Sequence, residues 1–318
     1  MSKRTVCILG GTGFVGRRLA ALLAAAGHEV FVITRHRERH KNLLVLPTAH
    51  LVEGDIRNPA LLRREFRGCD AVINLVGILN ERGRSGRGFE QVHVDLPRTI
   101  VQACRDSGVQ RLLHMSALGA SLDAPSHYLR SKARGESLVM ASEGDDLHVT
   151  AFRSSVIFGR GDNFTNRFVR LLHAAPLAFP LACPDARLQP VYVEDVASAF
   201  ALALDDPRTY GQSYSLCGPH VYSLRQIVEY LAGLAGVRRR IIALGDGLSR
   251  LQASILEFVP GKPFSLDNYR SLRRDSICEG GFPVVFGITP SSLEDVAPLY
   301  LGVDPSRRYS RYRSPGRA

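Results

Sequence analysis

A glycine-rich turn near the amino terminus places the strongest constraint on the fold. Gly10, Gly13 and Gly16 are spaced three residues apart, between the apolar run 6–9 and a segment whose apolar residues recur at helical spacing up to Gly27. A tight turn from a buried strand into a helix needs residues without Cβ atoms, and it leaves backbone N–H groups at the positive end of the helix dipole. The turn therefore predicts a site for the pyrophosphate of a dinucleotide.

The first half of the chain alternates apolar runs with segments of helical periodicity. The runs are nearly continuous, as in strands covered on both faces, and they lie at residues 6–9, 30–33, 51–53, 71–76, 112–116 and 149–152. Strands and helices that alternate in this way predict an α/β fold with a doubly wound parallel sheet, the Rossmann arrangement.

Beyond about residue 160 the pattern changes. Prolines interrupt the chain between 176 and 190, helical spacing returns at 193–204, 223–233 and 248–258, and residues 284–286 are expected to form a short strand. We predict a cofactor domain at 1–160 with a returning segment at about 189–205, a smaller mixed substrate domain at 161–305, and a disordered basic tail at 306–318. Six aromatic residues are expected in the core rather than lining an apolar pocket: Phe164, Phe168, Phe179, Tyr192, Phe258 and Phe264.

The charge balance is strongly basic. The 318 residues include 41 Lys and Arg against 30 Asp and Glu, a net charge of +11. The arginine-rich run at 307–313 is expected to be a plain solvated surface, with contact to an anionic membrane surface or an acidic protein as the alternative. We expect no nucleic-acid partner. No apolar run reaches the ~18–20 residues of a membrane span and no leader is evident, so we expect a cytoplasmic protein, with peripheral contact at the inner face of the membrane as a further possibility.

The cysteines are scattered, and none has the spacing of a metal site. They are interpreted as small buried residues without a partner, and no metal is predicted. The residues are Cys7, Cys69, Cys104, Cys183, Cys217 and Cys278.

The end of the second predicted strand indicates which dinucleotide binds. The acidic residue that usually contacts the adenosine ribose is missing, and Arg35 and Arg37 stand there instead. A guanidinium can bind a 2′-phosphate with two hydrogen bonds, so we predict NADP(H) in preference to NAD(H). The alternative is that both arginines belong to a basic surface loop. Asp55 ends the third strand and is expected near the adenine.

Further segments resemble one enzyme family. The glycine turn, Gly54-Asp55, Asn74-Leu75-Val76-Gly77 and the segment 153–159 resemble the extended, atypical short-chain dehydrogenases/reductases over nearly the whole chain, although Ser154 replaces a proline of the family pattern. Segments 73–79, 114–120 and 128–136 are similar to the branch that contains the nucleotide-binding accessory subunit of respiratory complex I and its bacterial relatives.

The resemblance implies a tightly held NADP(H) and an association with respiratory-chain or quinone biology, including a respiratory-chain protein as partner. The residues expected at the cofactor are Gly10, Thr12, Gly13, Phe14, Val15, Gly16, Arg35, Asp55, Ile56, Asn74, Val76, Gly77, Tyr128, Lys132 and Val156.

Three residues form a candidate catalytic group. Tyr128 and Lys132 lie four apart on a predicted helix that begins near Pro125, so their side chains point the same way, and Ser116 ends the fifth strand. They match the family's Ser, Tyr and Lys. In that chemistry hydride moves between the nicotinamide and a substrate carbon, the tyrosine exchanges a proton with the carbonyl oxygen, the serine donates a hydrogen bond to it, and the lysine binds the ribose and favours the phenolate.

Several functions stay open from the sequence. Tyr128 and Lys132 could bind only ribose in a redox-silent subunit. The first hypothesis is a complex-I-accessory type protein that carries NADP(H) or acts as a slow reductase. The second is a free oxidoreductase or epimerase acting on a sugar nucleotide or an isoprenoid-like carbonyl. The third is a scaffold that docks through its basic tail. His93, His114 and His127 are assigned no role.

Overall fold

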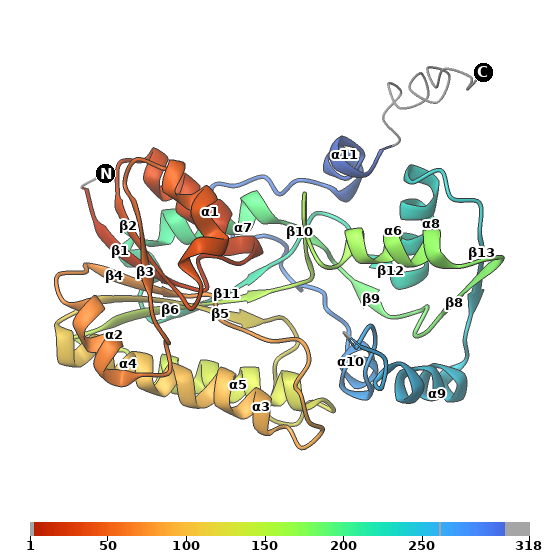
Figure 1. Cartoon of the computed structure of the whole chain (residues 1–318), viewed down its shortest axis with the longest axis horizontal. Helices are drawn as coiled ribbons and strands as arrows, with labels where there is room; N and C mark the ends of the chain where they lie inside the picture. The colour runs from red at the N-terminus through yellow and green to blue at the C-terminus, as the bar shows by residue number, and fades with distance from the viewer. Residues whose placement is uncertain (1–2, 261, 303–318) are drawn as a thin grey trace, which may run out of the picture.

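The computed structural model describes residues 3–260 and 262–302, and a seven-stranded parallel sheet is its centre (Figure 1). The strand order is β11-β6-β5-β4-β1-β2-β3. Consecutive strands run outward from β1 in one direction and from β4 in the other, which confirms the predicted doubly wound arrangement. The switch in direction lies between β1 and β4, where folds of this kind bind their ligands.

The elements of this layer are as follows. The sheet strands are β1 (Thr5–Leu9), β2 (Glu29–Thr34), β3 (Ala49–Glu53), β4 (Ala71–Asn74), β5 (Arg111–Ala117), β6 (His148–Ser154) and β11 (Gln212–Leu216). The helices are α1 (Phe14–Ala25), α2 (Pro59–Phe66), α3 (Arg87–Glu90), α4 (Leu96–Ser107), α5 (His127–Met140) and α7 (Val193–Ala203), with the short helices η1 (Arg37–Val45), η2 (Gln91–Asp95) and η3 (Pro207–Thr209).

The remaining elements lie beside this layer. They are β7 (Ile157–Phe158), α6 (Thr165–Ala174), β8 (Ala178–Leu181), β9 (Arg187–Leu188), β10 (Val191–Tyr192), β12 (Tyr222–Ser223), α8 (Leu224–Leu234), β13 (Arg240–Ala243), α9 (Asp246–Leu256), α10 (Leu266–Leu272), η4 (Val284–Phe286), α11 (Leu293–Val296) and α12 (Pro298–Leu301).

Both faces of the sheet are covered, which explains the continuous apolar runs. Helices α1 and α7 pack on one face, around Leu19, Val32 and Phe200, and helices α2, α4 and α5 pack on the other, around Phe66 and Val149 (Figure 1). No helix in the described ranges is long and apolar enough to cross a membrane.

The loop that follows β4 connects this layer to α9 and α10. The Lys262 ammonium donates to the carbonyl oxygens of Glu81 (2.9 Å) and Gly83 (3.2 Å). The Glu81 carboxylate accepts from the backbone N–H groups of Gly86 (2.7 Å) and Gly88 (2.8 Å), so this loop is held on both sides.

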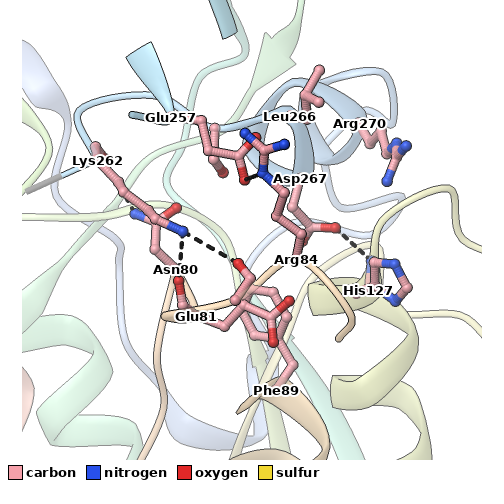
Figure 2. A pocket seen from close by; sticks show the side chains of 12 residues that line it. Asn80, Glu81, Arg84, Phe89, His127, Glu257, Lys262, Leu266, Asp267 and Arg270 are labelled. Atoms are coloured by element: carbon pink, nitrogen blue, oxygen red, sulfur yellow. Dashed lines mark hydrogen bonds and ion pairs between the residues drawn. The ribbon is translucent and has the colours of Figure 1, made fainter. Parts of the chain in front are cut away.

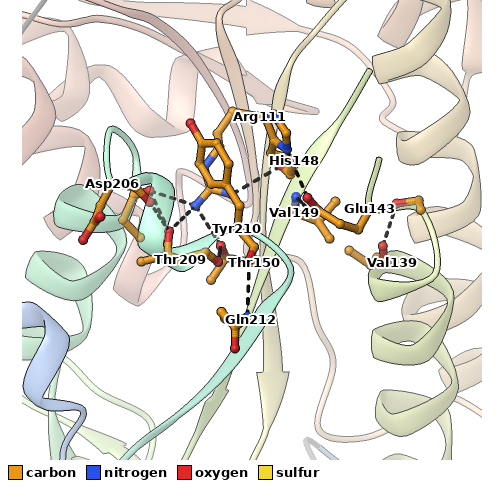
Figure 3. A network of polar contacts seen from close by, with 12 residues as sticks. Arg111, Val139, Glu143, His148, Val149, Thr150, Asp206, Thr209, Tyr210 and Gln212 are labelled. Carbon is orange, nitrogen blue, oxygen red and sulfur yellow. Dashed lines mark hydrogen bonds and ion pairs between the residues drawn. The ribbon is translucent and has the colours of Figure 1, made fainter. Parts of the chain in front are cut away.

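Segments α7 and β11 return to the sheet from beyond residue 160, and a buried arginine attaches them (Figure 3). The Arg111 guanidinium donates to Thr150 Oγ1 (2.7 Å), Thr209 Oγ1 (2.7 Å) and the carbonyl oxygen of Ala203 (2.8 Å), and it stacks over Tyr210. The observed return therefore reaches Leu216, past the predicted end near 205. The domain limits themselves remain a prediction.

A separate apolar cluster supports the second part of the chain. It is built on α8, with Ile227 and Leu231 fully buried, and four of the six aromatic residues noted above pack against or beside it: Phe164, Phe168, Phe179 and Tyr192. Phe264 is half-buried. The core prediction is wrong for Phe258, whose side chain is 76% exposed.

Two further predictions are wrong. Residues 284–286 form one 3-10 turn instead of a strand, because Pro283 starts the turn and Gly287, with a φ of 62°, ends it before any strand can pair. Cys217 and Cys278 form a disulfide, while Cys7, Cys69, Cys104 and Cys183 are free. Gln189 joins the two segments, since its side chain contacts Gly218 O and Cys278 N, and 61 residues of sequence separate the cysteines. The predicted tail at 306–318 lies outside the described residues.

We expect Arg111→Ala to lower the free energy of unfolding by about 3 kcal/mol, because three buried acceptors lose a charged donor. Chemical denaturation of the purified variant measures this. Arg208→Ala, at an exposed arginine paired with Asp206, is the control and should stay within about 0.5 kcal/mol of the wild type. Equal effects of the two substitutions would contradict the role given to Arg111.

Candidate cofactor and acid–base site

The glycine turn between β1 and α1 brings three backbone segments into close contact. Gly10 has a φ of 81°, and a Cβ on it would lie 3.1 Å from the carbonyl carbon of Leu75, just beyond β4. A Cβ on Gly16 would overlap the carbonyl oxygen of Gly10. The N–H of Gly13 donates to that same carbonyl at 2.9 Å. Side chains at Gly10 and Gly16 would therefore push α1 away from the sheet edge.

The amino terminus of α1 has no side-chain cap. Its N-cap is Gly13, and the first turn, which begins with Phe14 and Val15, contains no acidic residue. By contrast, Ser126 caps α5. The first N–H groups of a helix need an acceptor, and a phosphate at this position supplies one while also meeting the positive end of the dipole. The turn is thus built to accept an anion, with Thr12 partly exposed at its outer edge.

The residues predicted near the adenine lie at the ends of β2 and β3. Arg35 follows β2 directly, is exposed, and has no ion-pair partner in the described part of the chain. Both carboxylate oxygens of Asp55 accept from the guanidinium of Arg57, which lies two residues on. This pairing with Arg57 holds the pKa of the Asp55 carboxyl below its usual range. Ile56 is half-buried beside it.

Ser116, Tyr128 and Lys132 lie on two elements that pack together, β5 and α5. The Lys132 ammonium is buried and donates to the carbonyl oxygen of Met115 at 3.0 Å. Gly77 leaves room for it, because a Cβ there would lie 3.3 Å from the Lys132 nitrogen. Ser116 Oγ is buried and has no hydrogen-bond partner among the residues that the structure describes. An unpaired hydroxyl of this kind is uncommon in a folded protein and fits a site that awaits a polar ligand atom.

Burial shifts the pKa values of both titrating groups. Loss of solvent lowers the pKa of Lys132 to about 8, although the nearby Glu136 carboxylate opposes this effect. Loss of solvent also raises the pKa of Tyr128 to about 12. The tyrosine is therefore a phenol at neutral pH, and the lysine keeps most of its charge.

A buried polar cluster beneath these residues was missed by sequence reasoning. His93, in the π-helix η2, accepts from the N–H of Ile78 through Nε2 (3.1 Å), so its proton lies on Nδ1, which contacts Ser131 Oγ (2.9 Å). That hydroxyl donates to the carbonyl oxygen of Tyr128 (2.8 Å). Burial, then the Lys132 charge, lowers the pKa of His93 to about 2, so the ring is neutral.

The second histidine of the cluster is His114. Asn74 Nδ2 donates to its Nδ1 at 3.1 Å, and Asn74 Oδ1 accepts from the N–H of Val76 at 3.1 Å. Burial lowers the pKa of His114 to about 3, and its Nε2 has no hydrogen-bond partner in residues 3–260 and 262–302. The Asn74 side chain therefore holds the backbone of the loop at residues 75–77. No sequence motif marks these histidines. Gly135 is the one signal that the sequence offers for His93, because a Cβ on Gly135 would overlap the carbonyl oxygen of His93.

A cavity of about 170 Å³ lies next to the amino terminus of α5 (Figure 2). Asp267 of α10 accepts from the N–H groups of His127 (2.7 Å) and Tyr128 (3.0 Å), so it attaches the α10 segment to the start of the tyrosine helix. Arg84 and Glu257 form an ion pair across the lining, and Glu257 Oε2 is buried without a partner. The predicted cofactor residue Val156 is half-buried and packs against the apolar cluster of the second part of the chain.

The chain has known relatives in sequence. The NAD dependent epimerase/dehydratase family matches residues 6–217. Subunit 9 of the NADH dehydrogenase (ubiquinone) 1 alpha subcomplex, mitochondrial, from Mus musculus is 35% identical over 71% of this chain, and the match spans 60% of that protein's length. A ceramide reductase from Caulobacter vibrioides is 29% identical over 77% of this chain and 75% of its own.

A solved structure has the same fold. MoeE5 in complex with UDP-glucose and NAD superposes with a TM-score of 0.70 at 18% identity, covering 97% of this chain and 99% of its own. The similarity extends beyond the parallel sheet to the second part of the chain.

The buried lysine predicts a pH dependence of stability. Lys132 loses its proton at about pH 8 when folded and near 10.5 when exposed, so the unfolded chain binds more protons between these values and stability rises with pH across that window. Relative to Lys132→Met, the wild type should gain about 2 kcal/mol between pH 8 and pH 10. Chemical denaturation at several pH values measures this gain. Lys41→Met, at an exposed lysine, is the control, and parallel curves for wild type and Lys132→Met would contradict the shift.

Proposed function

The chain belongs to the NAD dependent epimerase/dehydratase family, and we propose that it is an NADP(H)-binding oxidoreductase that reduces a carbonyl group. The observation that carries the proposal is the unpartnered, buried hydroxyl of Ser116 on the strand against which α5, with Tyr128 and Lys132, is packed. A carbonyl oxygen placed there would satisfy that hydroxyl.

The proposed chemistry assigns one task to each side chain. When bound, the reduced nicotinamide supplies the hydride that the carbonyl carbon receives. Tyr128 donates its phenolic proton to the carbonyl oxygen, and its raised pKa of about 12 keeps that proton available at neutral pH. Ser116 donates a hydrogen bond to the same oxygen. The charged Lys132 lies beneath, where it holds the cofactor ribose and helps the tyrosine recover a proton.

The substrate class is also a proposal. The ceramide reductase among the relatives acts, by its name, on a lipid, and the complex I subunit is named for a ubiquinone-dependent enzyme. We therefore propose a quinone-related or lipid-like carbonyl, and an association with the respiratory chain or with a membrane surface. A sugar nucleotide is the second candidate, since MoeE5 holds UDP-glucose on the same fold.

Mass spectrometry of the nucleotide released from purified protein is the first test. We expect NADP⁺ or NADPH, and we expect the stripped protein to bind NADPH in a fluorescence titration. Absence of both results would overturn the proposed function.

Tyr128→Phe should lower carbonyl reduction by about 100-fold or more, since a positioned proton donor contributes at least that much. NADPH affinity should change little, because the ring is retained. Steady-state kinetics and NADPH titration measure the two effects. Tyr230→Phe, in α8, is the matched control. Undiminished turnover in Tyr128→Phe would remove the tyrosine from the mechanism.

Arg35→Ser should weaken NADPH binding by about tenfold, because a charge-assisted hydrogen bond to the 2′-phosphate is lost, and should leave NADH binding nearly unchanged. Isothermal titration with both cofactors measures this split. Arg67→Ser, at an exposed arginine beyond the end of α2, is the control. An equal loss for both cofactors would show that Arg35 does not contact the 2′-phosphate.

A further inference from the structure

Helix α9 turns most of its large apolar side chains toward solvent. Its inward side consists mostly of small or polar residues, with Ser249 and Ala253 fully buried and Glu257 following on the same side, and it includes one half-buried leucine, Leu256. Ser249 Oγ contacts the backbone of Cys183 and Leu244, which fixes the helix with this side inward. Helices on a protein surface normally turn their large apolar residues inward. Burial of apolar side chains in the core therefore does not explain the orientation of α9.

The outward side carries the large apolar residues. We call it the α9 face, and it comprises Leu248 (58% exposed), Leu251 (54%), Ile255 (59%), Phe258 (76%) and Val259 (40%). The spacing of these residues places them along one side of the helix and its carboxyl-terminal extension. A contiguous exposed apolar patch of this kind marks an interaction site.

Arginines lie on α9 and on the segment that contacts its carboxyl-terminal end. The Arg84 guanidinium lies 4.4 Å from the ring centroid of Phe258. Arg82 lies two residues before Arg84 in the same loop, Arg87 is the first residue of α3, and Arg250 lies on α9 itself; all three are exposed and have no ion-pair partner within the described ranges. Figure 2 shows Arg84 projecting from its loop toward the α9–α10 segment.

The neighbouring carboxylates cancel only part of this positive charge. Glu257 is paired with Arg84, and Asp246 accepts a hydrogen bond from Tyr269, so these two carboxylates stand against four arginines: Arg82, Arg84, Arg87 and Arg250. An exposed apolar helical face bordered by unpaired arginines is the arrangement by which amphipathic helices lie in the interface of a lipid bilayer that contains anionic headgroups.

We propose that the α9 face docks onto an anionic lipid bilayer. The apolar side chains enter the boundary between headgroups and acyl chains, and the arginines contact the lipid phosphates. A second copy of the chain fits less well, because a two-fold contact through this face would bring the same arginines against one another. This surface lies within the described residues and is separate from the tail at 306–318.

The docked orientation bears on substrate entry, a point that rests on the proposed function. Arg84 and Glu257 line the cavity beside the amino terminus of α5, and Arg84 also covers Phe258 of the α9 face. Docking would therefore hold that cavity at the edge of the lipid, where an amphipathic carbonyl compound could reach it. The docking itself can be tested without any substrate.

The chain contains no tryptophan, so one introduced residue reports on docking. In Phe258→Trp, emission should shift to shorter wavelength when phosphatidylcholine vesicles containing phosphatidylglycerol are added, and much less with phosphatidylcholine alone. Val284→Trp, at a residue 91% exposed in η4, is the matched control and should not shift. No shift in Phe258→Trp with either vesicle would overturn the proposal.

Vesicle sedimentation of the full-length protein is the second test. The double variant Leu251→Glu with Ile255→Glu should bind anionic vesicles at least about tenfold more weakly, and Arg250→Glu should reduce binding by a smaller factor. Leu299→Glu, at an exposed leucine of α12, should bind as the wild type does.

Two outcomes of that second test would overturn the proposal. Undiminished vesicle binding by the double variant would place the contact elsewhere, for instance in the tail. A dimer that the double variant loses, in protein that does not bind vesicles, would make a second copy the occupant. NADPH titration of the same variants is the folding control, and because it should be unchanged, failure of docking and failure of the proposed function are distinguishable.

Discussion

The close backbone contact between the turn after β1 and the first turn of α1 is the constraint on which the rest of the site depends. Gly16 lies against the carbonyl of Gly10, and Gly10 lies against the chain that leaves β4. These contacts place the uncapped end of α1 where the strand order reverses between β1 and β4. Any larger residue would separate the helix from the sheet and move its free N–H groups away from a bound phosphate.

Polar side chains are buried next to this edge of the sheet, at positions where apolar side chains would need no hydrogen-bond partners. His93 and His114 are held neutral by burial, and each has a defined partner, Ser131 for one and Asn74 for the other. Their hydrogen bonds fix the backbone of the loop after β4 and of Tyr128. Because both histidines are neutral, they add no positive charge beside Lys132, whose ammonium already costs free energy to bury.

Local patterns were sufficient for much of the fold. The six predicted strands of the sheet are present, with β4 ending at Asn74 rather than at residue 76, and α5, α7 and α8 begin within one or two residues of their predicted starts. These segments carry their own signals, namely continuous apolar runs, helical spacing, and a serine cap for α5 and α8. The seventh strand, β11, carries no such signal because Gln212, Ser213 and Ser215 interrupt it, and it forms only because β6 offers an edge.

The sequence by itself predicted the Rossmann sheet, the glycine turn and the candidate residues Ser116, Tyr128 and Lys132, because each carries a local signal: continuous apolar runs, glycine spacing, or a match to the family's motif. Only the tertiary structure decided which distant groups meet: Cys217 with Cys278, Arg111 with Thr209, and His93 with Ser131. It also decided that α9 turns Leu248, Leu251 and Ile255 outward, since helical spacing specifies that one face is apolar and cannot say on which side the protein lies.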